Sequence, residues 1–228
     1  MSHLPMPSFP VFRLTWLAVA MGTAFLFCAC AAPPAIKDYT LFRESRPHSI
    51  LVMPPVNQSP DINATASFLA TVTGPLAESG YYVIPVTLSE ETFKQNGVTV
   101  ANDAQAIPLN KLREIFGADA ALYLTITSYG THYQVLSSVV EAVASAKLVD
   151  LRTGRELWAD SVAVRLRNNN NSGGGIVGML VSAAVSQIAN TLSDQAFIAA
   201  RAADARMLSA GRQNGLLFGP YHPKFGTD

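Results

Sequence analysis

Cys30 is the residue whose chemistry the surrounding sequence defines most sharply, because it follows an apolar segment close to the N-terminus. Residues 1–15 carry one arginine as their only full charge, and Trp16 to Cys28 is an unbroken run of apolar and small residues. A weakly charged start before an apolar run too short to cross a bilayer is typical of a signal peptide. Small Ala29 suits the pocket of a signal peptidase. The pattern predicts a lipoprotein signal peptide over residues 1–29 and a palmitate-type lipid anchor on Cys30.

Two alternatives to Cys30 need to be weighed. Cys28 is the poorer acylation site, because bulky Phe27 would have to fill the peptidase pocket. An ordinary secretory signal cleaved near Ala31 or Ala32 is the other alternative. If Cys30 is acylated and Cys28 leaves with the signal, the mature chain has no free thiol and no disulfide, so stability must come from burial.

A glycine motif near the C-terminal third raises the question of nucleotide binding. Gly173 to Gly178 matches G-x-G-x-x-G and precedes a helical pattern. A dinucleotide site also needs a strand directly before the glycines and an acidic residue on a following strand. Here Asn168 to Asn171 separate the motif from the preceding strand, and no such acidic strand follows. We interpret the segment as a hinge loop, with a nucleotide site as the alternative.

The remaining titratable residues show no catalytic or metal-binding spacing. The histidines of the mature chain stand alone, with no second ligand two to four residues away, and the carboxylates Glu141 and Asp150 are isolated. No nucleophile elbow surrounds any serine. We therefore expect no catalytic residues, no metal, no cofactor and no small-molecule substrate. The histidines in question are His48, His132 and His222.

Composition limits the class of protein further. Lys and Arg number 16 and so do Asp and Glu, so no net charge indicates a nucleic-acid partner. Removing 29 of 228 residues leaves 199, enough for one domain, and 49% hydrophobic residues provide its core. No stretch after the signal is apolar and long enough to predict a transmembrane helix.

Strands and helices alternate in the first half of the mature chain. Residues 30–48 lack any period and are predicted to be a tether whose second half, with Tyr39, Leu41 and Phe42, lies on the domain. A buried strand at Ser49–Met53 stops at two prolines. The elements predicted next are a helix from Asn63 or Thr65 to Gly80 broken near Pro75, a strand at Tyr81–Val86 and a helix from Ser89 to Gly97. A further helix is predicted from Pro108 to Phe116, with Leu109, Leu112, Ile115 and Phe116 on one face.

Three extended segments follow one another in the second half. They are Ala120–Tyr129, Val139–Val149 and Leu157–Leu166, and the turn before the last contains Thr153-Gly154. Alternation followed by consecutive strands predicts an α/β fold. We expect a single domain over residues 49–228, with a mixed sheet that is parallel in its first half and ends in a long antiparallel hairpin, covered by helices.

A long Ala-rich helical pattern occupies residues 176–209, with a bend expected near Asn190 to Asp194. Its small residues permit close helix packing on the sheet, or an interface with a partner or a second copy. We predict that Ser182, Ser186 and Ala189 contribute to such an interface. After Gly211, an aromatic tail is expected to pack back onto the body.

Several linked motifs resemble a family of bacterial lipoproteins of unknown function, of the genome-derived-antigen type. The resemblance implies an outer-membrane-anchored periplasmic α/β domain, similar in plan to the soluble part of the curli-secretion lipoprotein and to the N-terminal domain of the Tol propeller protein. No catalytic residue carries over, and the pore-forming strands of the curli-secretion protein have no counterpart. The motifs lie at Arg46–Asn57, Pro75–Val83, Phe93–Gly97, Leu112–Ala120 and Lys147–Asp150, with Thr153-Gly154 and Trp158.

The function expected from the residues and the resemblance together is non-enzymatic. We expect a binding or assembly module anchored by lipid in the outer membrane, with its body in the periplasm, accessory to a curli-like secretion or envelope system. The alternative is a structural subunit that oligomerises with itself or with a secretion-channel lipoprotein. An envelope hydrolase is the third class, which a broad hydrolase screen would test.

Overall fold

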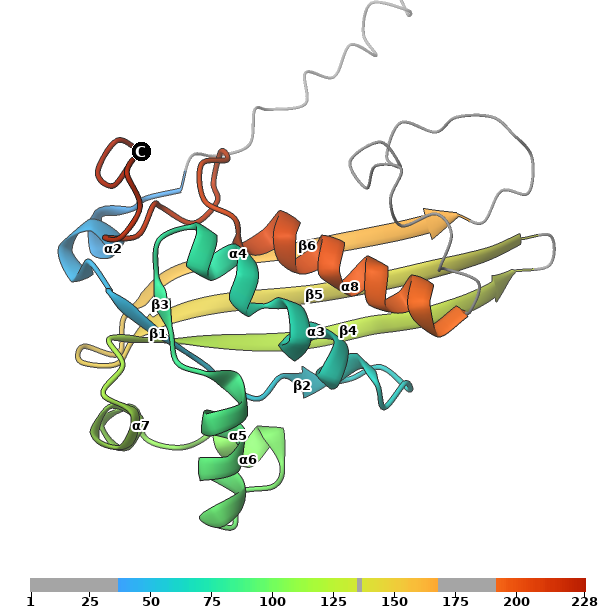
Figure 1. Ribbon diagram of the computed structural model, residues 1–228, viewed down its shortest axis with the longest axis horizontal. Coiled ribbons are helices and arrows are strands. Elements are labelled where there is room, and N and C mark those ends of the chain that lie inside the picture. Colours follow the sequence, from blue (N-terminus) through green and yellow to red (C-terminus); the bar gives the residue numbers. More distant parts are fainter. Residues whose placement is uncertain (1–36, 135–136, 168–191) are drawn as a thin grey trace, which may run out of the picture. The chain divides into compact units, whose positions relative to one another are not determined.

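The computed structural model describes residues 37–134, 137–167 and 192–228, and its strands form one mixed sheet (Figure 1). The strand order is β3-β1-β4-β5-β6, and β2 pairs with β4 beside β1. β1 runs parallel to β3 and β4, whereas β4, β5 and β6 are antiparallel, which confirms the predicted sheet. The strands are β1 (Ser49–Val52), β2 (Val56–Asn57), β3 (Tyr82–Val83), β4 (Ala120–Gln134), β5 (Ser137–Asp150) and β6 (Glu156–Arg167).

Helices cover the sheet on both faces. α3, α4 and α8 share one core with the even-numbered residues of β4 from Ala120 to Ile126, whereas α5, α6 and α7 share a second core with Ala121 and Tyr123. Successive side chains of a strand point to opposite faces, so the two cores lie on opposite sides of the sheet. The helices are α2 (Thr40–Ser45), α3 (Ala64–Thr71), α4 (Thr73–Glu78), α5 (Val86–Gln95), α6 (Ala101–Gln105), α7 (Leu109–Phe116) and α8 (Leu192–Leu208).

The unbroken apolar sequence of β1 is explained by its place inside the sheet, between β3 and β4. Ile50 and Val52 contribute to the core under α3 and α8, while Leu51 and Met53 contribute to the core under α5 and α7. A parallel strand buried on both faces has no position left for a polar side chain. The apolar run therefore marks a strand that is covered on both faces of the sheet.

Pro75 breaks the first long helix, as predicted. α3 ends at Thr71 and α4 starts at Thr73, so that Pro75 falls in the first turn of α4. Backbone N–H groups in the first turn have no partner within the helix, and a proline is tolerated there. Phe68, Val72 and Leu76 are all fully buried across the break.

Strand β3 is shorter than predicted, and α5 begins three residues earlier than Ser89. Ile84 N donates to Ile50 O, and the ladder with β1 ends there, because the chain turns into α5 at Val86. Pro85, at φ −54°, stands immediately before α5. The helix α6 had no counterpart among the predicted elements.

Two segments at the ends of the described chain close the domain. Phe42 of α2 is buried, and Tyr39 and Leu41 pack against the same core, as the sequence predicted. The C-terminal tail packs back as predicted, since Tyr81 Oη donates to Leu217 O over 2.6 Å. The helix predicted over 176–209 is described only as α8, because residues 168–191 lie outside the described ranges.

The turn between β5 and β6 depends on a glycine. Gly154 has φ +72°, and its N–H donates to Asp150 O over 2.9 Å. Glycine adopts this conformation freely, whereas a β-branched residue does not. Gly154→Val should therefore lower the free energy of unfolding by about 1 kcal/mol or more, seen as a lower thermal midpoint. Thr153→Ser, which leaves the glycine in place and keeps the hydroxyl that accepts from Arg155 N, is the neighbouring control. Equal midpoints for Gly154→Val and wild type would contradict the expected strain.

Candidate protein-interaction site

Several predicted site residues cannot be placed in this structure. Cys30 and the candidate interface residues Ser182, Ser186 and Ala189 lie outside the described residues, as does the glycine motif at 173–178. They stay predictions. The fold does place the other residues that were considered for chemistry.

His48 and His222 take part in separate local contacts, whereas the side chain of His132 lies outside the described part of the structure. The ring of His48 meets Tyr221 edge-on at 5.9 Å between centroids. His222 stacks on Phe218 at 4.2 Å, and its Nδ1 accepts a hydrogen bond from Lys224 N. Within the described ranges, no three His, Cys, Asp or Glu side chains gather in a way that could hold a metal ion.

The carboxylates Glu141 and Asp150 accept hydrogen bonds within the hairpin of β5 and β6. Glu141 Oε1 accepts a hydrogen bond from Arg165 Nε across β5 and β6. Asp150 is buried and accepts from Ser45 Oγ and from two backbone N–H groups of its own turn. Burial raises the pKa of Asp150, but these hydrogen bonds outweigh it and leave the pKa below its ordinary value. Both side chains therefore have a structural explanation.

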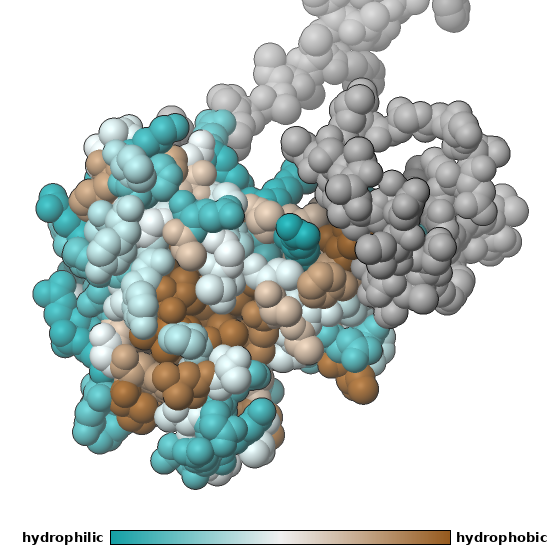
Figure 2. All heavy atoms as spheres, viewed as in Figure 1, coloured by the Kyte–Doolittle hydropathy of each residue, from teal (hydrophilic) through white to brown (hydrophobic). Residues whose placement is uncertain are grey.

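An apolar groove lies at the open edge of the sheet, between β3, α5 and α7. It encloses about 490 Å³, and no charged side chain lines it among the described residues. Figure 2 shows hydrophobic residues gathered on this side of the molecule, over β3 and the beginning of α5. Its apolar lining includes Tyr82, Ile84, Pro85, Leu88, Ile115 and Phe116.

Three large, mainly apolar side chains of this groove are more than half exposed to solvent. Tyr82 is 55% exposed, Leu88 60% and Ile115 53%. Each comes from a different element, so the exposed apolar surface is made by the tertiary fold. Contiguous apolar surface of this kind, with polar residues around it, marks sites where proteins interact.

The backbone beside the groove also has free hydrogen-bonding capacity. Tyr82 N and Ile84 N both donate to β1, to His48 O and Ile50 O. Because alternate residues of a strand turn their polar groups to opposite sides, Val83 directs its N–H and C=O away from β1. Among the described residues no strand pairs with β3 on that side. A sheet edge with unpaired groups can accept another strand.

The sequence patterns missed this groove for two reasons. Leu88 was assigned to the link before a helix at Ser89, and Ile115 was assigned to the packed face of its helix together with Phe116. In the structure Leu112 is fully buried, whereas Ile115 points outward. A usable signal existed, since Ser89 and Phe93 mark the buried side of α5 and Leu88 does not share their spacing.

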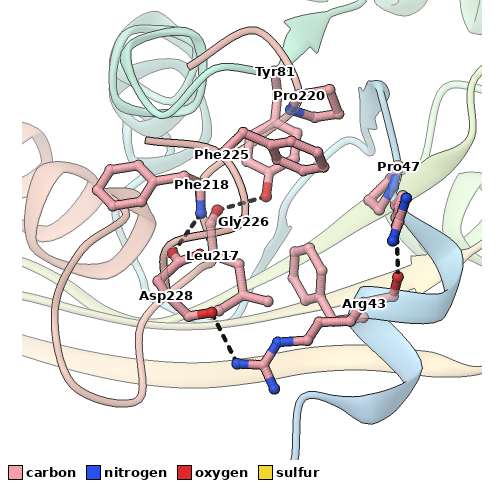
Figure 3. A pocket seen from close by; sticks show the side chains of 11 residues that line it. Arg43, Pro47, Tyr81, Leu217, Phe218, Pro220, Phe225, Gly226 and Asp228 are labelled. Atoms are coloured by element: carbon pink, nitrogen blue, oxygen red, sulfur yellow. Dashed lines mark hydrogen bonds between the residues drawn. The ribbon is translucent and has the colours of Figure 1, made fainter. Parts of the chain in front are cut away.

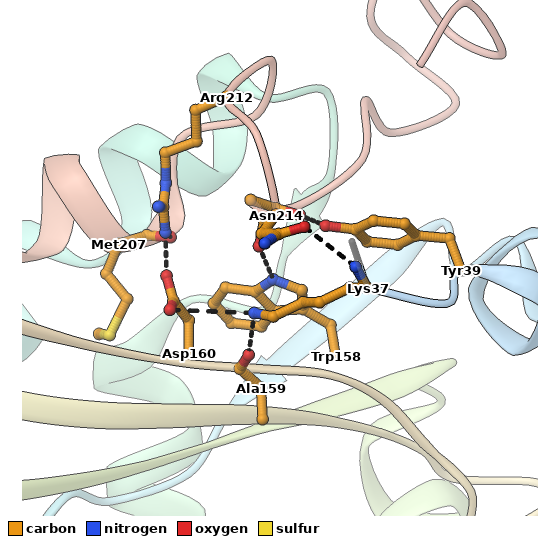
Figure 4. A network of polar contacts seen from close by, with 9 residues as sticks. Lys37, Tyr39, Trp158, Ala159, Asp160, Met207, Arg212 and Asn214 are labelled. Atoms are coloured by element: carbon orange, nitrogen blue, oxygen red, sulfur yellow. Dashed lines mark hydrogen bonds and ion pairs between the residues drawn. The ribbon is translucent and has the colours of Figure 1, made fainter. Parts of the chain in front are cut away.

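Polar contacts around Lys37 hold the first described residues against the domain, and we call them the clamp (Figure 4). Lys37 Nζ forms an ion pair with Asp160 and donates to Ala159 O, while Lys37 N donates to Asn214 Oδ1 over 3.0 Å. Asp160 also pairs with Arg212. Burial lowers the pKa of Lys37, against the opposing effect of Asp160. The clamp joins the start of the domain to β6 and to the loop before the tail.

These features define a class: an α/β domain with a mixed sheet, a clamped N-terminal segment and an apolar groove at one sheet edge. None of its helices, in the described ranges, is long and apolar enough to cross a membrane. Residues 37–221 match the family described as "Putative lipoprotein GNA1162-like", and the chain belongs to that family.

Individual proteins and solved structures are similar to this chain to different degrees. The chain is 49% identical over 205 residues to "Putative lipoprotein NMB1124/NMB1162" of Neisseria meningitidis serogroup B, covering 90% of this chain and 95% of that protein. The crystal structure of lipoprotein GNA1162 from Neisseria meningitidis has 56% identity and a TM-score of 0.53, and covers 64% of this chain and all of that one. The C-terminal domain of LpoB from Salmonella enterica has 18% identity and a TM-score of 0.39, and covers 51% of this chain and 82% of that one.

Proposed function

We propose that this protein is a lipid-anchored, non-enzymatic binding module of the outer membrane, with its body in the periplasm, and that its groove at β3 holds a segment of a partner protein. The observation that carries the proposal is the exposed apolar groove formed by Tyr82, Leu88 and Ile115 beside an unpaired strand edge. Membership of a lipoprotein family and the signal pattern ending at Cys30 support the anchor.

The chemistry of the groove specifies the segment that it suits. An extended partner strand can pair with the outward N–H and C=O of Val83, while its alternate side chains enter the groove. Those side chains should be apolar, because no charged group lines the groove in the described part of the chain. Backbone pairing would contribute affinity, and burial of apolar side chains would contribute specificity.

Glutamate substitutions in the groove test the proposal. Leu88→Glu and Ile115→Glu place a charge where the apolar segment would lie, and burying an unpaired charge is costly. The partner is crosslinked in intact cells and then recovered from solubilised outer membrane. Each variant should give at least about tenfold less crosslinked partner than wild type. That loss corresponds to about 1.4 kcal/mol. Ile62→Glu is the matched control, because Ile62 is 87% exposed and does not line the groove.

The same experiment separates the competing functions. Loss of a distinct partner from Leu88→Glu and Ile115→Glu, with Ile62→Glu unchanged, supports a binding module. If the lost species is a second copy of this chain, the groove is a self-association surface and the module is a structural subunit. Unchanged crosslinks in both groove variants would contradict the site. Identification of the partner would also show whether it belongs to a curli-like secretion system, as the resemblance implies.

A further inference from the structure

The C-terminal tail and α2 together form a second surface with a pocket, separate from the groove at β3 (Figure 3). The tail packs beside α2, where Arg43 Nη2 donates to Asp228 O over 2.9 Å and Phe218 N donates to Asp228 Oδ2 over 2.7 Å. A pocket of about 360 Å³ opens between them, with Arg43, Arg46 and Phe225 among its lining residues. We call this the tail surface.

The tail surface combines exposed aromatic and basic side chains. Tyr221 is 68% exposed and Phe225 is 42% exposed, although both are large and apolar. Arg46 and Lys224 are exposed as well, and Lys224 Nζ lies 5.8 Å from the centre of the Phe218 ring. Aromatic rings with neighbouring Lys and Arg are the combination that settles at the boundary between lipid headgroups and acyl chains.

The chain leaves the domain next to this surface. Tyr39 Oη donates to Gly215 O, and Lys37 N donates to Asn214 Oδ1, so the clamp holds the start of the domain against the loop that precedes the tail. Six residues, 31–36, separate Lys37 from Cys30. Seven residue-to-residue steps span at most roughly 25 Å, whatever their conformation.

We propose that the tail surface rests on the bilayer that holds the lipid of Cys30, with Tyr221 and Phe225 in the headgroup region and Arg46 and Lys224 against lipid phosphates. This inference rests on the lipid anchor of the proposed function. The short connection keeps the tail surface near the headgroups, and the aromatic and basic side chains supply the chemistry that binds them.

The length of β4 gives the distance from the tail surface to the opposite end of the domain. The tail end lies near Asp119, whose Oδ2 accepts from His48 N, and the ring of His48 contacts Tyr221. The loop with Asp61 lies against Gly130, eleven residues further along. At about 3.3 Å per residue the two sites are roughly 35 Å apart along β4. Ile62 is therefore an exposed position far from the tail surface.

Depth-dependent fluorescence quenching tests the inference on the full lipoprotein. Purified protein, with acylation established by mass, is reconstituted into phosphatidylethanolamine and phosphatidylglycerol vesicles that contain headgroup-spin-labelled lipid. A bimane fluorophore is attached to Tyr221→Cys, to Phe225→Cys or to the control Ile62→Cys. Quenching at the two tail positions should be at least about twofold greater than at position 62. Equal quenching at all three positions would overturn the inference.

A charge variant tests the contact with phosphate. Arg46→Gln combined with Lys224→Gln should reduce quenching of the Phe225→Cys fluorophore. Unchanged quenching would overturn the proposed contact of these two basic side chains with lipid phosphates. Failure of the lipid anchor would appear earlier, as unmodified protein in the mass measurement. Failure of the groove would appear only in the crosslinking of Leu88→Glu and Ile115→Glu. The three results are therefore distinguishable.

Discussion

Replacing Asp204 with Asn should abolish most of a steep loss of stability that the wild-type protein shows between about pH 4 and pH 8. Asp204 of α8 is fully buried, and Thr71 Oγ1 donates to its Oδ2 over 2.6 Å. Its Oδ1 has no hydrogen-bond partner among the described residues. Burial raises the pKa of Asp204 to about 8, against the lowering effect of the Thr71 hydrogen bond.

The sign of the pH dependence follows from proton binding. The folded protein keeps the Asp204 proton up to about pH 8, whereas the unfolded chain releases it near the ordinary value of 3.8. Between these values the folded state holds the extra proton, so stability is greatest below about pH 4 and falls as pH rises towards 8. The slope approaches about 1.4 kcal/mol per pH unit, and relaxation of the structure reduces the total to a few kcal/mol.

Thermal unfolding at a series of pH values measures this effect. An amide cannot ionise, so the Asp204→Asn profile should be nearly flat, and above pH 8 its midpoint should exceed that of wild type by several degrees. Asp103→Asn, at an exposed position of α6, is the matched control and should follow the wild-type profile. Parallel profiles for wild type and Asp204→Asn would contradict a buried proton at this site.

Asp204 also illustrates what local sequence can reveal. It lies four residues after Ala200 and three before Met207, which are both fully buried, so helical spacing places it on the packed face of α8. A lone carboxylate on such a face was visible in the sequence. Its partner Thr71 was not, because the contact joins residues 133 positions apart.

Much of the fold was predictable because the spacing of apolar residues and the positions of proline and glycine follow local rules. The apolar run of β1, the break at Pro75 and the positive φ of Gly154 each follow from a local rule, and each occurs in the structure. The extent of β3 was not predictable in this way. Its ladder with β1 ends because α5 begins at Val86, and the start of that helix depends on packing that the local sequence does not specify.

The spacing of α5 set Leu88 apart from the buried side of its helix, but the groove as a whole was not predictable, for a different physical reason. Tyr82, Leu88 and Ile115 are exposed because α5 and α7 leave a gap beside the sheet edge, and that gap depends on tertiary packing. On α7, Leu109, Leu112 and Phe116 fall within a narrow arc, while Ile115 lies about 100° around the helix from Phe116. An isoleucine at such a boundary position is buried or exposed according to its neighbours.

Cys30→Ala should abolish lipid attachment completely, which is the largest effect expected of any single substitution in this chain. Acyl transfer requires the thiol of the cysteine that follows the signal, and alanine has no nucleophile to offer. Each buried methylene contributes about 0.8 kcal/mol, so several acyl chains hold a protein in the membrane essentially irreversibly, whereas one chain does not. The variant should accumulate as an unlabelled precursor in cells grown with radioactive palmitate.

Cys28→Ala is the matched control for this experiment, since it removes the other cysteine of the chain and leaves Cys30 in place. It should label like wild type. Normal labelling of Cys30→Ala would refute the assignment of Cys30, and loss of label in Cys28→Ala would move the site. Because Ala31 rather than Asp follows the cysteine, we expect labelled protein in outer-membrane fractions. Recovery in inner-membrane fractions alone would contradict that localisation.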